Sequence, residues 1–197
     1  MNKSADTEHD LNTLIKNRWS PRAFDPAAKV TKAELEALFE AARWAPSSNN
    51  SQPWRYLYGI RGDATFGKIL ENLKPNNARW AFRASALAVA VARTKKPDGT
   101  VEKTGQYDTG QASAYFSLQA QHRGLSVRQM AGFQPSIAEA LAIPADYTPM
   151  AVIAIGGRGD AALLGDETLH AQEVSIRTRR PLAGIAHNGE WSADFEV

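Results

Sequence analysis

SALAVAVA, residues 85–92, holds only small or branched apolar side chains after its first serine. A strand of this composition is buried on both faces, because neither of its two alternating sets of side chains offers a polar surface to water. PMAVIAIG (149–156) is a second run of this kind, and WRYLYGI (54–60) indicates a third strand. Together these runs predict a central sheet covered on both sides.

Helical patterns surround the predicted strands. Thr31 and Glu34 have the spacing of a capping box, and apolar residues follow at the spacing of one helix face, so a helix is predicted from Thr31 to a point before Pro46. A second capping box, Ser136 with Glu139, predicts a short helix that ends before Pro144. The other helices are expected at 8–17, at 63–72, from a cap at Asp108 to about His122, and at 160–173 with Asp160 as N-cap.

The mixture of helices and strands shows no strict alternation, so the predicted fold class is α+β, with three layers around a central sheet. Three strands are few for a sheet of usual size, which leaves room for a strand contributed by a tail or a partner. No linker or internal repeat divides the chain, and residues 1–197 are expected to form a single domain.

Composition narrows the classes of function. The net charge of +2 is too small to indicate a nucleic acid or a membrane as partner, and the absence of cysteine excludes disulfides and thiolate chemistry. The four histidines share no metal-ligand spacing, so no metal is expected. The polar N-terminus resembles neither a secretory signal nor a transit peptide, so we expect a soluble, cytoplasmic protein.

A dense cluster of small polar groups lies in RWAPSSNNSQPW (43–54), between Trp44 and Trp54. One interpretation is a helix end closed by capping amides, with both tryptophans anchored in the core. That interpretation leaves the density of hydroxyl and amide groups unexplained, so the loop is a candidate binding element.

Two groups of arginines are candidates for an anion site. In NRWSPRAFD (17–25), Arg18, Ser20 and Arg22 alternate, so an extended segment would point all three to one side. In SIRTRRPL (175–182), three arginines lie within four positions and repel one another unless an anion is bound. A solvated turn and a solvated tail are the simpler interpretations. A phosphate held between Arg18 and the second group would account for both.

In this order and spacing, the stretch from Asn17 to Gly59 resembles the N-terminal signature of the FMN-dependent nitroreductases. The resemblance continues through NARWAFRASALAVAVA, YDTGQASAYFSLQAQHRGLSVRQMAGF and RTRRPL, and covers roughly residues 10–182. It implies an α+β sandwich with a mostly antiparallel central sheet flanked by helices. It also implies an intertwined homodimer with FMN at the subunit interface.

The resemblance assigns roles to residues by motif. Arg18 would bind the FMN phosphate with the terminal arginines, Ser20 and Arg22 would face the polar edge of the ring, and Asn77 would contact its pyrimidine end. The loop of Pro46, Ser47, Ser48 and Asn50 would reach the flavin of the partner subunit. Backbone N–H groups of Met130, Ala131 and Gly132 would approach flavin N5 and O4. The full cofactor-binding set is Arg18, Trp19, Ser20, Arg22, Pro46, Ser47, Ser48, Asn50, Asn77, Met130, Ala131, Gly132, Arg177, Arg179 and Arg180.

The implied activity is the transfer of hydride from NAD(P)H through flavin N5 to a nitroaromatic, quinone or enone, by a ping-pong mechanism that needs no catalytic side chain. Two residues depart from the family pattern: several members have Glu where this chain has Ala131, and Lys where it has Trp80. The alternatives are another flavin reaction on the same fold, a non-catalytic FMN-binding protein and an anion-binding module without flavin. The choice between NADH and NADPH stays open, as does the physiological acceptor.

Overall fold

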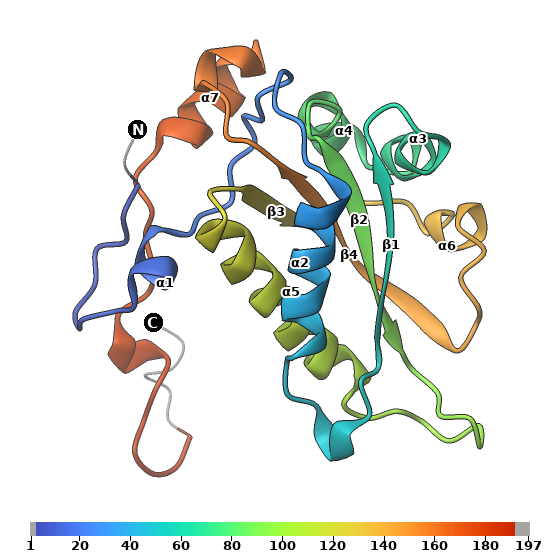
Figure 1. The fold of residues 1–197 in the computed structure, drawn as a ribbon. Coiled ribbons are helices and arrows are strands. Elements are labelled where there is room, and N and C mark those ends of the chain that lie inside the picture. The colour runs from blue at the N-terminus through green and yellow to red at the C-terminus, as the bar shows by residue number, and fades with distance from the viewer. Residues whose placement is uncertain (1–2, 192–197) are drawn as a thin grey trace.

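A four-stranded sheet lies at the centre of the computed structural model, which describes residues 3–191 (Figure 1). The strands are β1 (Trp54–Ile60), β2 (Ala86–Arg93), β3 (Ser126–Met130) and β4 (Tyr147–Gly156). They lie in the order β1-β2-β4-β3, and each neighbouring pair is antiparallel. The fold class is α+β, and the three strands predicted from the sequence are confirmed. The edge strand β3 was not predicted.

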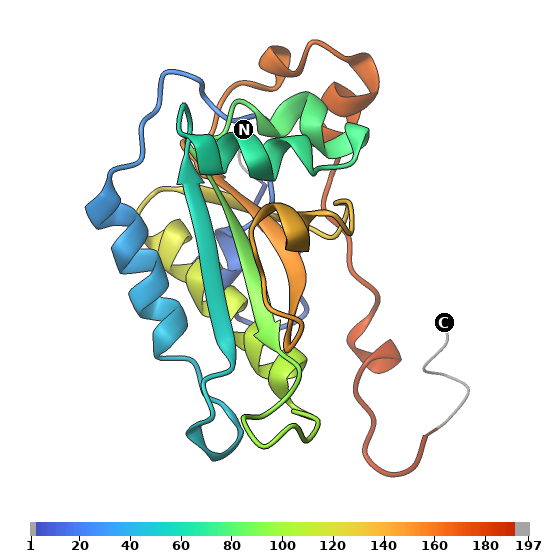
Figure 2. The same cartoon turned by 90° about the vertical axis from the view of Figure 1, so that its right-hand side faces the viewer.

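Helices cover both faces of the sheet, which is why β2 is apolar on both sides. Leu87, Val89 and Val91 point into one core with residues of α3 (Ala64–Glu71) and α4 (Pro75–Ala81). Ala86, Ala88 and Ala90 point into a second core with α2 (Lys32–Arg43) and α5 (Gly105–His122). Figures 1 and 2 show α2 and α5 on one side of the sheet, with α3, α4 and the short α6 (Ile137–Ala140) on the other.

The capping box predicted for α2 is confirmed. The Glu34 backbone N–H donates to Thr31 Oγ1 at 3.2 Å, and the Thr31 N–H donates to Glu34 Oε2 at 2.7 Å. The prediction that Trp44 anchors in the core is wrong, because its side chain is 70% exposed. Ala42 and Ala45 take the inward positions at this helix end, while Trp54 is buried as expected.

Several predicted helix boundaries need correction. Helix α1 (Thr13–Asn17) is shorter than predicted, and α4 was missed. Asp108 is not a cap: α5 begins three residues earlier, and the Asp108 side chain is buried in its first turn. Ser136 makes no capping hydrogen bond, because its own backbone is already helical and its hydroxyl contacts Asn72 Oδ1.

The predicted helix over 160–173 is divided in two. Asp160 caps the 3₁₀ turn η2 (Ala161–Leu164), as predicted, by accepting from the Ala162 N–H at 2.8 Å. Gly165, at φ 64°, then ends the turn, and Asp166 caps α7 (Glu167–Val174). A left-handed residue cannot continue a right-handed helix, which explains the break. Two further 3₁₀ turns are η1 (Ser48–Asn50) and η3 (Leu182–Gly184).

The two terminal segments run side by side along one flank of the molecule (Figure 1). The Arg177 guanidinium donates to the carbonyl oxygens of Lys3 and Lys16, and the Leu182 N–H donates to Glu8 Oε1. These bonds bring the arginine-rich C-terminal segment next to the N-terminal one. Among the described residues, no helix is long and apolar enough to cross a membrane.

Candidate functional site

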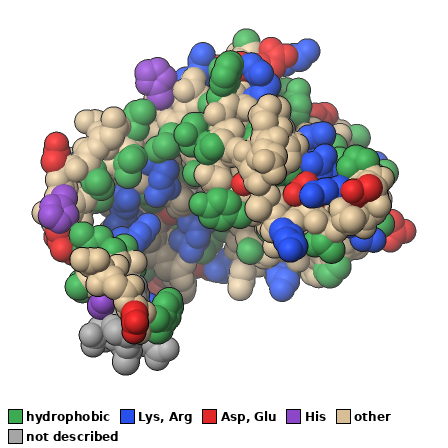
Figure 3. Space-filling model, turned by 90° about the horizontal axis from the view of Figure 1, so that it is seen from below, with side chains coloured by type: hydrophobic (Ala, Val, Ile, Leu, Met, Phe, Trp, Pro, Cys, Tyr) green, Lys and Arg blue, Asp and Glu red, His purple; other side chains and the backbone are tan. Residues whose placement is uncertain are grey.

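The arginines of the two sequence groups line one pocket of about 210 Å³. The first group approaches from the segment between α1 and α2, and the second from the segment that follows α7. The residues from the predicted set in this pocket are Arg18, Trp19, Ser20, Arg22, Arg177 and Arg179. Arg180 lies beside it, in a second hollow that also contains Arg18 and Arg177. Seen from below, Lys and Arg side chains gather in a recess between the terminal segments and the rest of the molecule (Figure 3).

Ser20 lies between two guanidinium groups. Arg18 Nη1 donates to Ser20 Oγ at 3.2 Å, and Arg128 Nη1 donates to the Ser20 carbonyl oxygen at 2.5 Å. Arg128 comes from β3 and was not among the residues that the sequence singled out. Its guanidinium lies 5.6 Å from the centre of the Trp80 ring.

The pocket carries positive charge without matching carboxylates. Within the part of the chain that the structure describes, the arginines that line this pocket make no salt bridge. The buried acid among them, Glu173, accepts instead from the backbone N–H groups of Arg22 and Ala23, at 2.9–3.1 Å.

Burial and mutual repulsion both act against these charges. Burial lowers the pKa of Arg18, and the neighbouring charges of Arg177 and Arg179 lower it further. Burial lowers the pKa of Arg128 to about 10, with a further contribution from Arg22. Such depressed values indicate a site that gains stability when an anion enters.

Asn77 and the segment after β3 form a second group. Asn77 Nδ2 donates to the Gly132 carbonyl oxygen at 3.0 Å, and the Lys74 N–H donates to the same oxygen. A Cβ added at Gly132 would lie 2.6 Å from Asn77 Nδ2, so a larger residue would have to displace the Asn77 amide from this position. Met130 is buried and Ala131 is exposed. The backbone here is therefore fixed by α4.

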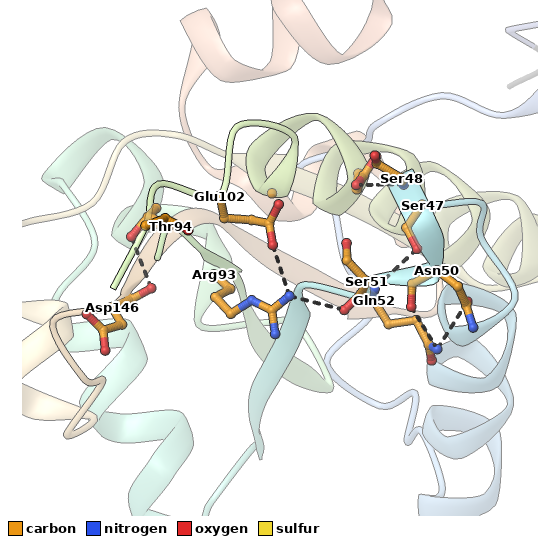
Figure 4. Close-up of polar contacts among 12 residues, drawn as sticks. Ser47, Ser48, Asn50, Ser51, Gln52, Arg93, Thr94, Glu102 and Asp146 are labelled. Carbon is orange, nitrogen blue, oxygen red and sulfur yellow. Dashed lines mark hydrogen bonds and ion pairs between the residues drawn. The ribbon is translucent and has the colours of Figure 1, made fainter. Parts of the chain in front are cut away.

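The loop from Pro46 to Gln52 is the third group, and it is held in an unusual conformation. Asn49, Asn50 and Gln52 have φ values of 49°, 54° and 43°. The Ser48 N–H donates to Asp108 Oδ2, and the Gln52 N–H donates to Ser47 Oγ (Figure 4). Non-glycine residues in this region are strained by about 1–3 kcal/mol each, and such strain clusters at functional sites.

A buried ion pair between Arg93 and Glu102 supports the C-terminal part of the loop. Arg93 Nη2 lies 3.0 Å from Glu102 Oε2 and also donates to the Ser51 carbonyl oxygen at 3.4 Å (Figure 4). The two side chains are 19% and 6% exposed. The loop therefore rests on rigid supports from β2 and α5, while Ser48, Asn49 and Asn50 stay exposed.

The structure does not bring the third group to the arginine pocket within one chain. The loop follows α2 at one end of the molecule, whereas α7 lies at the other end in both views (Figures 1 and 2). Any site that combines the two groups needs a second chain.

Known proteins resemble this chain along most of its length. The model of the Nitroreductase family matches residues 15–61. An uncharacterised 15.4 kDa protein of Mycolicibacterium smegmatis is 34% identical, covering 70% of this chain and 97% of that protein. A solved structure described as an oxidoreductase containing FMN is 33% identical, has a TM-score of 0.88 and covers 95% of this chain and 96% of its own. The chain belongs to the nitroreductase family.

Sequence similarity to named enzymes of this family is less extensive. The oxygen-insensitive NAD(P)H nitroreductase of Salmonella typhimurium is 30% identical over 114 residues, which are 53% of this chain and 52% of that enzyme. The match therefore spans about half the length of that nitroreductase.

Trp80 and Ala131, the two residues expected to differ from other members, lie in different settings. Trp80 is fully buried, stacks on Phe24 with ring centres 6.2 Å apart, and faces Arg128. Ala131 is exposed beside Gly132. Arg128 and Glu173 line the pocket but were not predicted from the sequence. Arg128 could have been found from its position two residues before Met130, because alternate residues of a strand lie on the same side.

Proposed function

We propose that this chain is an FMN-dependent oxidoreductase that passes hydride from NAD(P)H to a nitroaromatic, quinone or enone acceptor. The observation that carries the proposal is the convergence of Arg18, Arg177 and Arg179 on one pocket, where no carboxylate of residues 3–191 forms a salt bridge with them. A phosphate monoester fits this donor set, because guanidinium groups bind phosphate oxygens through paired N–H donors.

The second half of the pocket fits the polar edge of a flavin ring. Arg22 and Ser20 line the pocket together with Arg18, Arg177 and Arg179. Asn77 of α4, which is bonded to Gly132 in the segment after β3, would contact the pyrimidine end of a bound ring. Positive charge from Arg22 would stabilise negative charge that develops on the ring when it is reduced. The backbone at Ala131 and Gly132 would orient the reactive end of the ring.

The site would be completed by a second chain. In this proposal the exposed loop of Pro46, Ser47, Ser48 and Asn50 contacts the cofactor of a partner, in an intertwined homodimer. Its support by Asp108 and by the Arg93–Glu102 pair would hold the small polar groups in place without the partner. Such preorganisation reduces the entropy lost on binding.

Bound FMN would supply the hydride chemistry, so the chain needs no acid or base of its own. What the chain contributes is a fixed anion site, a positive ring edge and a pre-shaped loop. Orientation of two reactants at one site lowers the barrier by removing the entropy cost of their meeting.

The visible spectrum of the purified protein, before and after anaerobic NADPH, tests the proposal. Flavin bands that bleach with NADPH and return with a quinone or nitroaromatic are the expected result. Flavin that neither NADPH nor NADH reduces would contradict the enzyme and leave an FMN-binding protein. A protein that takes up no FMN would favour a plain anion-binding module.

A pair of variants tests the phosphate assignment. Replacing Arg18 and Arg179 together by Ala should leave a largely colourless protein, with at least a hundredfold weaker FMN binding. The matched control replaces Arg123 and Arg158, which are exposed and lie outside this pocket. Full retention of FMN by the first pair would overturn the assignment.

A further inference from the structure

Arg128 is a charged residue in the core-facing position of an edge strand. It pairs with Ala154 of β4, and its neighbours Val127 and Gln129 point to the opposite face. Its side chain ends between the Ser20 carbonyl oxygen, at 2.5 Å, and the face of Trp80, at 5.6 Å. A buried aromatic face and a carbonyl dipole hold a guanidinium in place without neutralising it.

The charge of Arg128 is not balanced within the described part of the chain. It makes no salt bridge there, and Glu173, an acid in the same pocket, is bound to two backbone N–H groups. An arginine that is shielded from water and left without a counter-charge is costly to keep. Such a residue indicates a ligand that carries negative charge.

Arg128 approaches the pocket from β3, beside Trp80 of α4, whereas Arg18, Arg177 and Arg179 approach from the two terminal segments. It interacts electrostatically with Arg22, whereas Arg18 interacts with Arg177 and Arg179. Along β3, residue 128 lies two positions, or about 6.6 Å, from Met130 on the same side of the strand. On α4, Trp80 lies one turn from Asn77 and on the same side.

We propose that Arg128 sets the redox potential of the cofactor by placing, with Arg22, a second positive charge at the edge of the flavin ring. This inference rests on the proposed function, and Arg128 would contact the ring edge from β3. It also gives a role to Trp80, because the buried indole supports the guanidinium that comes from β3.

The test is a dye-mediated redox titration of the FMN-loaded protein, together with the dissociation constant of oxidised FMN. Arg128→Met removes the charge and keeps an unbranched apolar stem, and Arg128→Lys keeps the charge. Arg158→Met is the control, because it removes the same charge from an exposed arginine. Neither measurement depends on turnover.

Arg128→Met should bind reduced FMN at least tenfold more weakly, relative to oxidised FMN, than the wild type does. For a two-electron couple this ratio lowers the midpoint potential by about 30 mV. Arg128→Lys should recover at least half of that shift, and Arg158→Met should show none. If the Met variant folds poorly, Arg128→Gln removes the same charge, keeps a polar end and should show the same shift.

Two results would overturn the inference. The first is an unchanged midpoint potential in Arg128→Met; if both oxidation states of FMN then bind equally more weakly, Arg128 is a plain binding residue. The second is a drop of the potential in Arg128→Lys as large as that in Arg128→Met, which would show that packing matters and charge does not. If the wild type binds no FMN, the proposed function itself is wrong, and that outcome is separate from the other two.

Discussion

Glu173 shows how one buried acid can shape a cationic pocket without neutralising it. The residue is 4% exposed, and its carboxylate accepts three hydrogen bonds from the N–H groups of Arg22 and Ala23. These bonds fix the backbone that carries Arg22, while the guanidinium stays available. The acid from α7 therefore positions the segment between α1 and α2.

Glu173→Gln should destabilise the protein by about 1–3 kcal/mol, because the amide removes the charge that strengthens these bonds and replaces the oxygen that accepts the shorter bond from the Arg22 N–H. The measurement is urea denaturation of wild type and variant. Glu36→Gln is the matched control, since Glu36 is 61% exposed and its surface pair with Lys32 is worth little. Equal stability of Glu173→Gln and wild type would show that the backbone contacts are not needed.

The sequence predicts the charged members of this pocket better than their supports. Arg18, Ser20 and Arg22 alternate, and the structure indeed brings all three to one pocket. Glu173 could not be predicted, because its partners are backbone N–H groups about 150 residues away, and a backbone group leaves no signature in the sequence. Arg128 was not predicted because its strand, β3, is only five residues long and was itself not recognised in the sequence.

At the scale of single elements, the capping box of α2 makes a pH-dependent contribution. Hydrogen bonds from the Thr31 backbone N–H and then from its hydroxyl lower the pKa of Glu34 below its ordinary value of 4.5. A pKa lowered by folding means that the folded state favours the carboxylate. The stabilisation is therefore complete above 4.5 and is lost as the pH falls through the folded-state value.

Glu34→Gln keeps an acceptor oxygen at this cap but cannot ionise. The wild type should be more stable than this variant at pH 7, and the difference should shrink once the pH falls below 4.5. Thr31→Ala, which removes the cap itself, should cost about 1 kcal/mol at pH 7. Denaturant titrations across this pH range measure both effects. A difference for Glu34→Gln that stays constant into acid would contradict the assigned role.

Elements with a strong local pattern were predictable, and those defined by their surroundings were not. The helix α2 has a cap and a regular apolar face, and β2 and β4 are continuous apolar runs. The strand β3 mixes polar and apolar residues because it lies at the sheet edge, and only its pairing with β4 defines it. The side chain of Trp44 was wrongly predicted to be buried for a related reason: its position around the axis of α2, and not its hydrophobicity, directs it to solvent.

For the molecule as a whole, the exposed side of α5 bears on the proposed homodimer. The opposite side of the helix packs into the core through Ala112, Phe116 and Ala120. The exposed side carries Tyr107, which is 72% exposed, and Tyr115, which is 44% exposed. Tyrosine is enriched at interfaces between protein chains. This face therefore supports the proposed homodimer, in which the loop after α2 would reach the partner's cofactor.

Gly110 lies on this exposed face, and an added Cβ there would meet nothing within 4 Å in one chain. Because glycine costs about 1 kcal/mol in a helix interior relative to alanine, Gly110→Arg should not destabilise an isolated chain. In a homodimer packed on α5, the same change should split the dimer and release FMN. Size-exclusion chromatography with light scattering measures the oligomeric state, and the flavin absorbance of the eluted protein measures the FMN that it retains. Gly67→Arg is the matched control, since Gly67 is a helical glycine of α3 that is equally free of contacts, and it should stay dimeric and yellow. A Gly110→Arg protein that remains dimeric and holds FMN would place the subunit interface elsewhere.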